Sequence, residues 1–197
     1  MTGLKGHPIY AHVGSVCGFQ GGSQPPKSVF SSEPKAGFIR LLQIRDFKSE
    51  KFAVYIPESK KNRLCVADDI MIGRYGASVG QIHRGKAGAY NVALIKTIPN
   101  LGVLDVGFFY YYLTSPLFQK PLLATASRSA QDGFGKEDIA DFPIPLPPLE
   151  EQRRIVAVLD EAFAAIASAT ANLQKQIGLM GDLKQSLLGK AFGGDLV

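Results

Sequence analysis

Apolar residues at heptad spacing fill the last quarter of this chain and predict one long helix. They follow a proline-rich strap, Ile144 to Leu149 (IPLPPL), and two acidic residues, Glu150 and Glu151. Prolines hold the strap extended, and acidic side chains stabilise a first helical turn because the helix N-terminus carries partial positive charge. The heptad positions are Ile155, Leu159, Ala162, Ile166, Ala169, Leu173, Gln176, Met180, Leu183 and Leu187. A helix of about 40 residues would be about 60 Å long, far more than a small core requires, which indicates a spacer or a docking rod.

The apolar stripe on this expected helix needs a partner. Nine of the ten heptad positions are apolar, with Gln176 as the exception, and a lone helix would leave the stripe in water. We therefore expect a homodimer that forms through the C-terminal helix. Val156, Phe163 and Ile177 flank the heptad positions and widen the stripe, which suggests a second protein partner.

Two glycines interrupt the otherwise favourable composition of the helix. Gly178 and Gly181 each cost roughly 1 kcal/mol of helix stability relative to alanine. They indicate a kink or a close helix crossing. The alternative is a helix that ends near Gln176 and restarts.

The basic charge of the chain belongs to its first three quarters. Residues 1–147 contain 17 Lys and Arg against 11 Asp and Glu, a net of +6, whereas residues 148–197 contain 5 against 6. We therefore divide the chain into a globular domain, residues 1–147, and a helical domain, residues 148–197. A basic domain is typical of proteins that bind polyanions, although many basic domains bind nothing acidic.

Short β-rich runs and few helices characterise the globular domain. Strand-like runs cover residues 38–47, 52–56, 69–73, 79–82 and 92–98. A helix is expected over 105–115, ended by Pro116, and a helical turn over 136–140. The helix carries five consecutive aromatics, Phe108 to Tyr112, which we expect mainly in the core and not as a base-stacking platform. The expected fold class is α/β (α+β) with a mixed β-sheet, followed by a long C-terminal coiled-coil helix.

Catalytic and metal-binding patterns are missing from the sequence. The segment Gly22 to Ser28 has Pro26 in place of the glycine that a phosphate-binding loop requires before its lysine. The methyltransferase signature of Asn or Asp, two prolines and an aromatic does not occur. The three histidines have no metal-ligand spacing, and Asp68 with Asp69 is expected to form a solvated turn. We therefore expect no cofactor, no metal and no enzyme activity of the chain itself.

Two isolated cysteines, Cys17 and Cys65, are expected to be free thiols in a reducing cytoplasm. No apolar run has the length of a membrane span, and residues 1–10 lack the pattern of a signal peptide. We expect a cytoplasmic protein that makes no contact with a membrane.

Basic and polar residues gather around the strand-like runs and the glycine-rich loop 73–80, and they predict a DNA-binding surface. The candidates are Arg40, Arg45, Lys48, Lys60, Lys61, Arg74, Tyr75, Gln81, Arg84 and Arg128. Arginine binds a guanine edge with two hydrogen bonds and glutamine binds adenine, whereas lysine binds phosphate, so Lys60 and Lys61 are assigned to the DNA backbone. Each residue taken alone is better explained as a solvated surface charge, and the cluster is a stronger indication than any one member.

The strap and the start of the helix resemble a known signature. The run Phe142 to Val156, FPIPLPPLEEQRRIV, closely resembles the segment that opens the long helix of type I restriction–modification specificity subunits. Upstream segments are similar to features of the target recognition domain in that family. These segments are 21–26 (GGSQPP), 38–46, 72–80, and 129–131 before 136–140. The resemblance covers nearly the whole chain, and the strap with Glu-Glu-Gln is its most specific part.

The resemblance implies a subunit without chemistry of its own. Such a subunit reads one half of a bipartite DNA site and holds modification subunits, which methylate adenine N6 with S-adenosylmethionine; a nuclease and translocase subunit can join for restriction. Complete family members have two recognition domains and two long helices packed antiparallel, whereas this chain has one of each. It is either a fragment or a half-sized subunit that pairs with a second copy. A twofold dimer would recognise an interrupted, pseudo-palindromic site.

Two other functions fit the same residues. In the first, the chain is the recognition half of a single-chain methyltransferase–nuclease, which would not assemble with separate modification subunits. In the second, it is a coiled-coil adaptor whose globular domain binds protein. The adaptor would show no salt-dependent DNA binding, whereas a DNA reader loses affinity steeply as salt rises.

Overall fold

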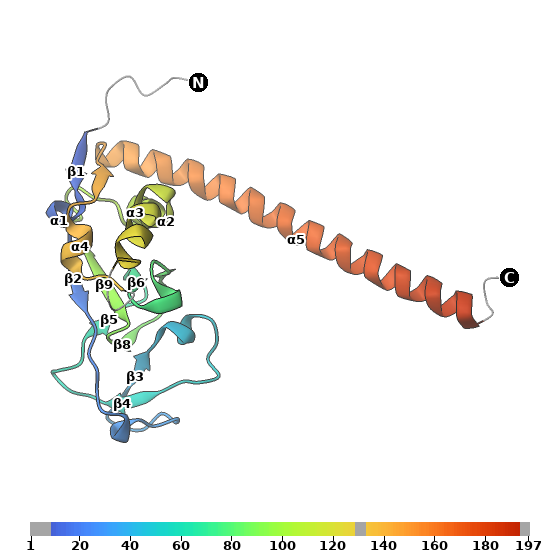
Figure 1. Cartoon of the computed structure of the whole chain (residues 1–197), viewed down its shortest axis with the longest axis horizontal. Helices are drawn as coiled ribbons and strands as arrows, with labels where there is room; N and C mark the ends of the chain where they lie inside the picture. The colour runs from blue at the N-terminus through green and yellow to red at the C-terminus, as the bar shows by residue number, and fades with distance from the viewer. Residues whose placement is uncertain (1–8, 129–132, 194–197) are drawn as a thin grey trace. The chain divides into compact units, whose positions relative to one another are not determined.

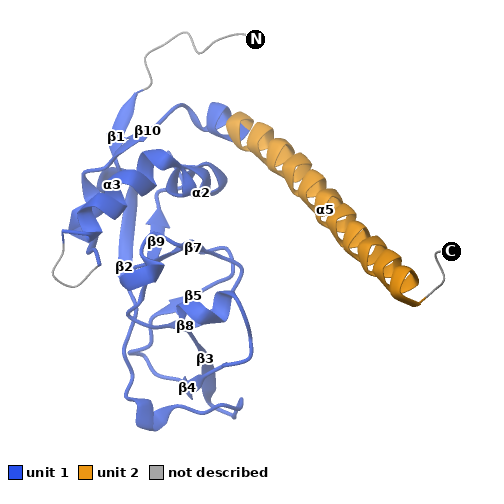
Figure 2. Cartoon of the chain, turned by 45° about the vertical axis from the view of Figure 1, so that its right-hand side comes forward, with its two compact units in different colours: residues 1–153 blue, residues 154–197 orange. Residues whose placement is uncertain are grey.

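A computed structural model of the chain describes residues 9–128 and 133–193, and the chain divides into two units. The first unit comprises residues 1–153 and the second residues 154–197 (Figure 2). This boundary lies inside the long helix, whereas the sequence suggested a boundary at 147/148, just before the helix begins.

Three small β-sheets build the first unit. An antiparallel sheet has the order β2 (Cys17–Gly21), β9 (Leu94–Pro99), β6 (Met71–Gly73), β7 (Ile82–His83). A second sheet has the order β4 (Tyr55–Pro57), β3 (Phe38–Leu42), β8 (Gly88–Tyr90), β5 (Leu64–Cys65). The third pairs β1 (Tyr10–His12) with β10 (Pro143–Pro145). Because β3 and β8 run parallel while the other pairs of the second sheet are antiparallel, the predicted mixed sheet is confirmed.

The helices of the first unit are short and gather at one end of it. They are α1 (Val13–Val16), α2 (Val106–Thr114), α3 (Pro116–Ala126) and α4 (Lys136–Ala140), and three 3-10 turns are η1 (Lys27–Val29), η2 (Ile44–Phe47) and η3 (Gly76–Ser78). Figure 1 shows α1 to α4 beside β1, whereas β3 and β4 lie at the opposite end of the unit. The sheet β2-β9-β6-β7 lies between these two ends.

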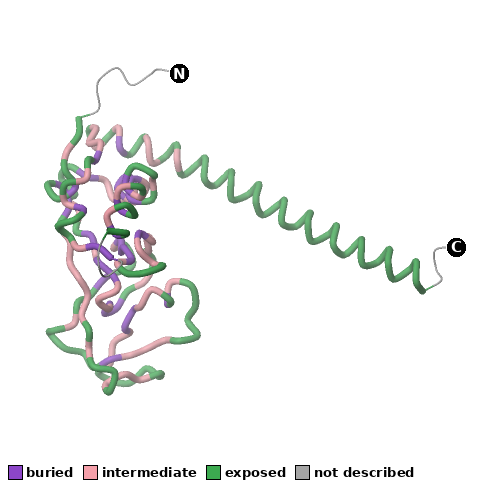
Figure 3. The backbone as a smooth tube through the Cα atoms, viewed as in Figure 1, coloured by how far each residue is buried: buried purple, intermediate pink, exposed green. Residues whose placement is uncertain are grey.

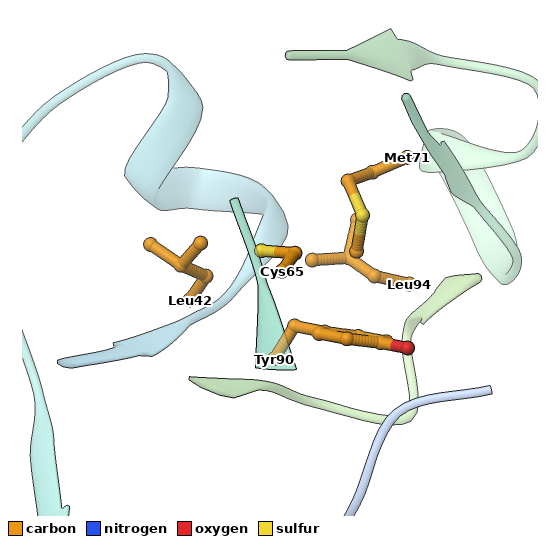
Figure 4. Packing of buried hydrophobic residues seen from close by; sticks show 5 residues of the cluster. All are labelled: Leu42, Cys65, Met71, Tyr90 and Leu94. Atoms are coloured by element: carbon orange, nitrogen blue, oxygen red, sulfur yellow. The ribbon is translucent and has the colours of Figure 1, made fainter. Parts of the chain in front are cut away.

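One apolar cluster joins the two four-stranded sheets. Leu42, Cys65 and Tyr90 come from the second sheet, and Met71 and Leu94 come from the first; each is at most 4% exposed (Figure 4). The Tyr90 hydroxyl is satisfied by the side-chain oxygen of Gln20 on β2 at 3.0 Å. Burial of these side chains fixes one sheet against the other, which is what gives the loops at their edges a defined position.

The expected helix over 105–115 is confirmed as α2. Asp105 caps it by accepting a hydrogen bond from the backbone N–H of Phe108 at 3.1 Å. Phe108, Phe109 and Tyr112 are buried, as expected, whereas Tyr110 and Tyr111 are partly exposed.

The first helix ends before Pro116, as expected, but the chain continues directly into a second helix. The proline is the first residue of α3, a helix of 11 residues that the sequence analysis did not predict. Proline suits the first position of a helix because its missing N–H would have no intrahelical partner there. Proline therefore ends α2 and begins α3 at once.

The long helix is confirmed as α5 (Leu149–Gly193), 45 residues without interruption. At 1.5 Å per residue it is about 68 Å long. The alternative of a helix that ends near Gln176 and restarts was wrong. A Cβ at Gly178 or Gly181 would meet no atom within 4 Å, so no residue that the structure describes packs against either glycine.

The second unit exposes the apolar stripe that the heptad spacing predicted. The exposed fractions are Ile166 58%, Leu173 59%, Met180 64%, Leu183 60% and Leu187 49%. Flanking Phe163 and Ile177 are 51% and 68% exposed. Figure 3 shows exposure along most of this helix. The heptad positions from Ala162 to Leu187 are exposed, whereas Ile155 and Leu159 near the start of the helix are partly buried.

The expectation that no segment is apolar enough to cross a membrane needs correction. Helix α5 contains an 18-residue window with a mean hydropathy of 1.4, so its length and composition suffice for a membrane span. Length and composition are shared by membrane spans and by helices that pack on partner helices. The heptad spacing of the apolar residues favours a partner helix.

Candidate nucleic-acid interface

Two segments of the first unit are joined by an aromatic stack and carry cations on either side of it. The Phe47 ring, on η2, lies 4.5 Å from the His83 ring on β7, at an interplanar angle of 20°. Lys48 and Arg84 follow these two rings in the chain, and both are exposed. The stack therefore brings the end of η2 beside the end of β7.

Each cation near this stack lies over an aromatic ring or in water. The Arg84 guanidinium is 4.1 Å from the ring centroid of Tyr110 on α2, and the Arg45 guanidinium is 5.6 Å from that of Phe52. Rings orient an arginine without neutralising its charge. We call Arg45, Lys48 and Arg84 the basic edge. None of the three forms an ion pair with another residue that the structure describes.

His83 is held neutral beside the basic edge. Burial lowers the pKa of its imidazole below the ordinary 6.5, and the positive charge of Lys48 lowers it further. Its Nε2 is buried and has no hydrogen-bond partner among the described residues. His83 thus acts as an apolar stacking partner for Phe47 and adds no charge to the edge.

A second group of candidates surrounds the glycine-rich loop. Arg74 donates from Nε to the backbone oxygen of Phe134 at 3.1 Å, and its guanidinium lies 5.0 Å from the Tyr75 ring centroid. Tyr75 pairs with Gly133, where a Cβ would come within 2.5 Å of the tyrosine ring. Gln81 donates to the backbone oxygen of Ala77 at 3.1 Å. The loop is therefore closed on itself and fixed against the segment that precedes α4.

Arg128 lies beside this second group. It is exposed and is the second residue after α3; Leu123 of the last turn of α3 and Ser127 just after the helix line a hollow together with Gly76 and Ala77. The resemblance noted for residues 129–131 falls outside the described residues.

Lys60 and Lys61 lie on a separate turn between β4 and β5. The backbone N–H of Lys61 donates to Ser59 Oγ at 3.2 Å, and Asn62 Nδ2 donates to the backbone oxygen of Pro57 at 3.0 Å. Both lysines are exposed. A structured turn that presents two lysines to water suits a phosphate contact.

Arg40 differs from the other candidates because carboxylates surround it. Its Nη2 lies 3.0 Å from Asp46 and 2.9 Å from Glu50, and its side chain is 16% exposed. The structure thus gathers Arg45, Lys48 and Arg84 in one place and Arg74, Tyr75, Gln81 and Arg128 in another. It leaves Lys60 and Lys61 on a turn of their own and Arg40 inside an ion-pair network.

Gln152 is a structural residue whose role sequence reasoning missed. It is fully buried in the first turn of α5, within the Glu-Glu-Gln motif. Its Nε2 donates to the backbone oxygens of Val103 and Pro147, both at 2.8 Å, and its Oε1 accepts from the backbone N–H of Asp105 at 2.8 Å. These bonds tie the helix start to the strap and to the cap of α2. The signal in the sequence was that Gln152 is the single neutral amide among neighbours that are all apolar or charged.

The described residues contain no group of three or more His, Cys, Asp and Glu side chains that could hold a metal ion. Cys17 and Cys65 are free and buried. Burial raises the pKa of the Cys17 thiol to about 12 and that of the Cys65 thiol to about 11, so both are protonated and unreactive at neutral pH. Asp69 forms the expected turn, accepting from the backbone N–H of Val66 at 2.9 Å, but it also pairs with Lys96.

The chain is similar to proteins of one kind. A family model described as type I restriction modification DNA specificity domain matches residues 11–178. The EcoBI specificity subunit of Escherichia coli is 31% identical over 137 residues, 70% of this chain and 28% of that protein. The MjaVIII specificity subunit of Methanocaldococcus jannaschii is 23% identical over 180 residues, 91% of this chain and 40% of that protein.

Solved structures give the same result for the fold. The HsdS subunit from Thermoanaerobacter tengcongensis is 27% identical, with a TM-score of 0.71 over 99% of this chain and 47% of that one. A chain from a structure concerned with complex assembly of the type I R-M system is 27% identical, with a TM-score of 0.81 over 99% of this chain and 48% of that one. The chain spans less than half the length of these relatives. It belongs to the family of type I restriction–modification DNA specificity domains.

Proposed function

We propose that this chain is a non-catalytic DNA-recognition subunit of a type I restriction–modification complex in the cytoplasm. The observation that carries the proposal is the family match over residues 11–178, which extends from the first unit well into α5. The chain reads one half of a bipartite site and positions adenine-N6 methyltransferase subunits, and a nuclease and translocase subunit joins the same complex for restriction.

The first unit supplies the contacts to DNA. The basic edge presents two arginines, Arg45 and Arg84, that are free of carboxylate partners among the described residues and therefore suit guanine edges. Arg74 and Tyr75 offer a cation and a ring on a closed loop, with Gln81 and Arg128 nearby. Lys60 and Lys61 grip phosphates. The net charge of +6 on residues 1–147 supports binding of a polyanion.

The second unit supplies the pairing. A second copy of the chain covers the apolar stripe of α5, which gives a twofold dimer with two recognition units. Such a dimer reads the same half-site twice, in inverted orientation, across a spacer of constant length. The stripe is wider than a heptad seam because of residues such as Phe163 and Ile177, and this extra width docks the modification subunits.

Selection from randomised duplex DNA tests the proposal. The purified chain, with and without modification subunits, is incubated with the library at low salt, and bound duplexes are sequenced over several rounds. The expected result is one enriched half-site, repeated in inverted orientation, and a steep loss of binding as salt rises. Binding that is absent, or that enriches no sequence under either condition, contradicts DNA recognition and favours the coiled-coil adaptor.

A further inference from the structure

A charge network ties together the two segments that carry the basic edge. Its centre is Asp46 on η2, which is fully buried. One carboxylate oxygen accepts a hydrogen bond from the backbone N–H of Gln43 at 2.6 Å, and the other pairs with Nη2 of Arg40 on β3 at 3.0 Å. A buried carboxylate requires such partners because burial removes its hydration. Asp46 therefore closes the η2 turn and fixes it to β3.

Arg40 extends this network to the turn between β7 and β8. Its Nη2 also lies 2.9 Å from Oε2 of Glu50, and the other oxygen of Glu50 pairs with Lys86. Lys86 lies on that turn, two residues after Arg84. The network thus links the chain just after η2 to the chain just after Arg84, alongside the stack of Phe47 on His83.

The surroundings of Arg40 leave it little room to move. On the neighbouring strand Gly88 has φ +148°, and a Cβ there would lie 2.7 Å from the backbone oxygen of Arg40. The Arg40 side chain is only 16% exposed. Its Nη2 is already paired with two carboxylates, so a base contact through this nitrogen would compete with Asp46, and loss of that pair would strand a buried charge without its partner.

Resting on the function proposed above, we propose that Arg40 is a positioning residue and not a DNA ligand: with Asp46, Glu50 and Lys86 it holds the basic edge in one arrangement and thereby sets sequence specificity. A two-bond contact between an arginine and a base edge requires the side chain to arrive at a defined place and angle. A phosphate contact tolerates more displacement because it is largely electrostatic. Loss of the network therefore weakens discrimination between sequences before it weakens general binding.

Glu50→Gln separates positioning from simple electrostatics, because the two effects have opposite signs. Glu50 is 64% exposed, so the variant folds, and removal of its negative charge alone would raise affinity for every sequence. Positioning predicts instead that the ratio of affinities for the selected site and a scrambled site falls about tenfold, with no loss on the scrambled site. The matched control is Glu58→Gln, an exposed glutamate that forms no ion pair with any described residue, and it should raise both affinities together.

A double-mutant cycle provides the second measurement. Lys86→Gln should lower the ratio about as much as Glu50→Gln, and the double variant should be no worse than either single variant because all three lose the same link. The inference is overturned if Glu50→Gln behaves like Glu58→Gln, or if the two single effects add. A wild-type chain without any sequence preference would contradict the proposed function itself, which the selection experiment reveals first.

Discussion

Among the described residues, the first unit contains buried leucines and the second contains none. In the first unit, Leu41 is 1% exposed and Leu113 is 0% exposed, whereas in the second unit Leu173 is 59% and Leu183 is 60% exposed. Both units have folded backbones, but every buried apolar side chain of the described residues belongs to the first unit. The exposed apolar side chains of the second unit favour a partner for this helix.

The charges follow the same division. Residues 1–147 hold the basic surplus of +6, whereas residues 148–197 carry 5 Lys and Arg against 6 Asp and Glu. A helix without a basic surplus is a poor ligand for DNA, and a basic unit with a covered core is a poor candidate for apolar pairing. If the first unit binds DNA and the second pairs, as proposed above, substitutions should affect one property without the other.

The largest effect should come from charge on the apolar stripe. Leu173→Glu with Leu183→Glu places two carboxylates on each helix where the partner packs, and we expect dimer affinity to fall about 1000-fold, or about 4 kcal/mol. Sedimentation velocity measures the dissociation constant. The matched control is Ala171→Glu with Gln185→Glu, on the opposite side of the heptad, which should leave the dimer intact. Equal weakening by both pairs would show that the stripe is not the interface.

Gln152→Leu should have the next largest effect, which is a loss of stability of the first unit. The variant removes the fully buried amide of Gln152 and leaves three backbone groups, at Val103, Asp105 and Pro147, without its hydrogen bonds, and we expect a loss of about 3 kcal/mol in free energy of unfolding. Urea unfolding followed by circular dichroism measures it. Gln185→Leu, at an exposed glutamine of α5 outside the heptad positions, serves as the control and should cost nothing. A neutral Gln152→Leu would mean that the start of α5 is not fixed by this side chain.

Arg84→Ala should affect DNA binding and spare assembly. If Arg84 contacts a base edge, affinity for the selected site falls by about 2 kcal/mol with little change on a scrambled site. Lys175→Ala on α5 is the control and should change neither affinity. Fluorescence anisotropy at several salt concentrations gives both values. A uniform loss on all sequences would assign Arg84 to a phosphate.

Low pH should destabilise the first unit through protonation of His83. This is the smallest of the four predicted effects. Burial and Lys48 lower the pKa of His83 in the folded chain, so below about pH 6.5 the unfolded chain binds a proton that the folded chain resists. Stability is therefore full above pH 6.5 and declines as pH falls. Urea midpoints at pH 7.5 and 5.5 should show a smaller difference in His83→Gln than in the wild type. An equal difference between the two urea midpoints in wild type and variant would show that His83 does not cause the acid dependence.

Much of the fold was predictable because local patterns determine it. Heptad spacing predicted α5, and the aromatic run after Asp105 predicted α2. The sequence did not predict β5 and β8, because strands of two and three residues are held by tertiary pairing and leave no periodic pattern.

The candidate site was predicted in composition and only partly in arrangement. The exposed cations of the basic edge were all named from the sequence, since charge type is visible there. The ion pairs of Arg40 were not, because they depend on how β3 and η2 approach each other in space. The stack of Phe47 on His83 was missed for the same reason, because the two residues are 36 positions apart in the sequence.

The solution mass of the wild-type chain tests the central claim most directly. Light scattering during size-exclusion chromatography, over a range of loading concentrations, gives that mass without any DNA or partner protein. Our account requires a second copy on the stripe of α5, so it predicts a mass of about twice 21.2 kDa that is stable to dilution. A mass of 21.2 kDa at every concentration would contradict self-pairing and show that the exposed helix is reserved for a different chain.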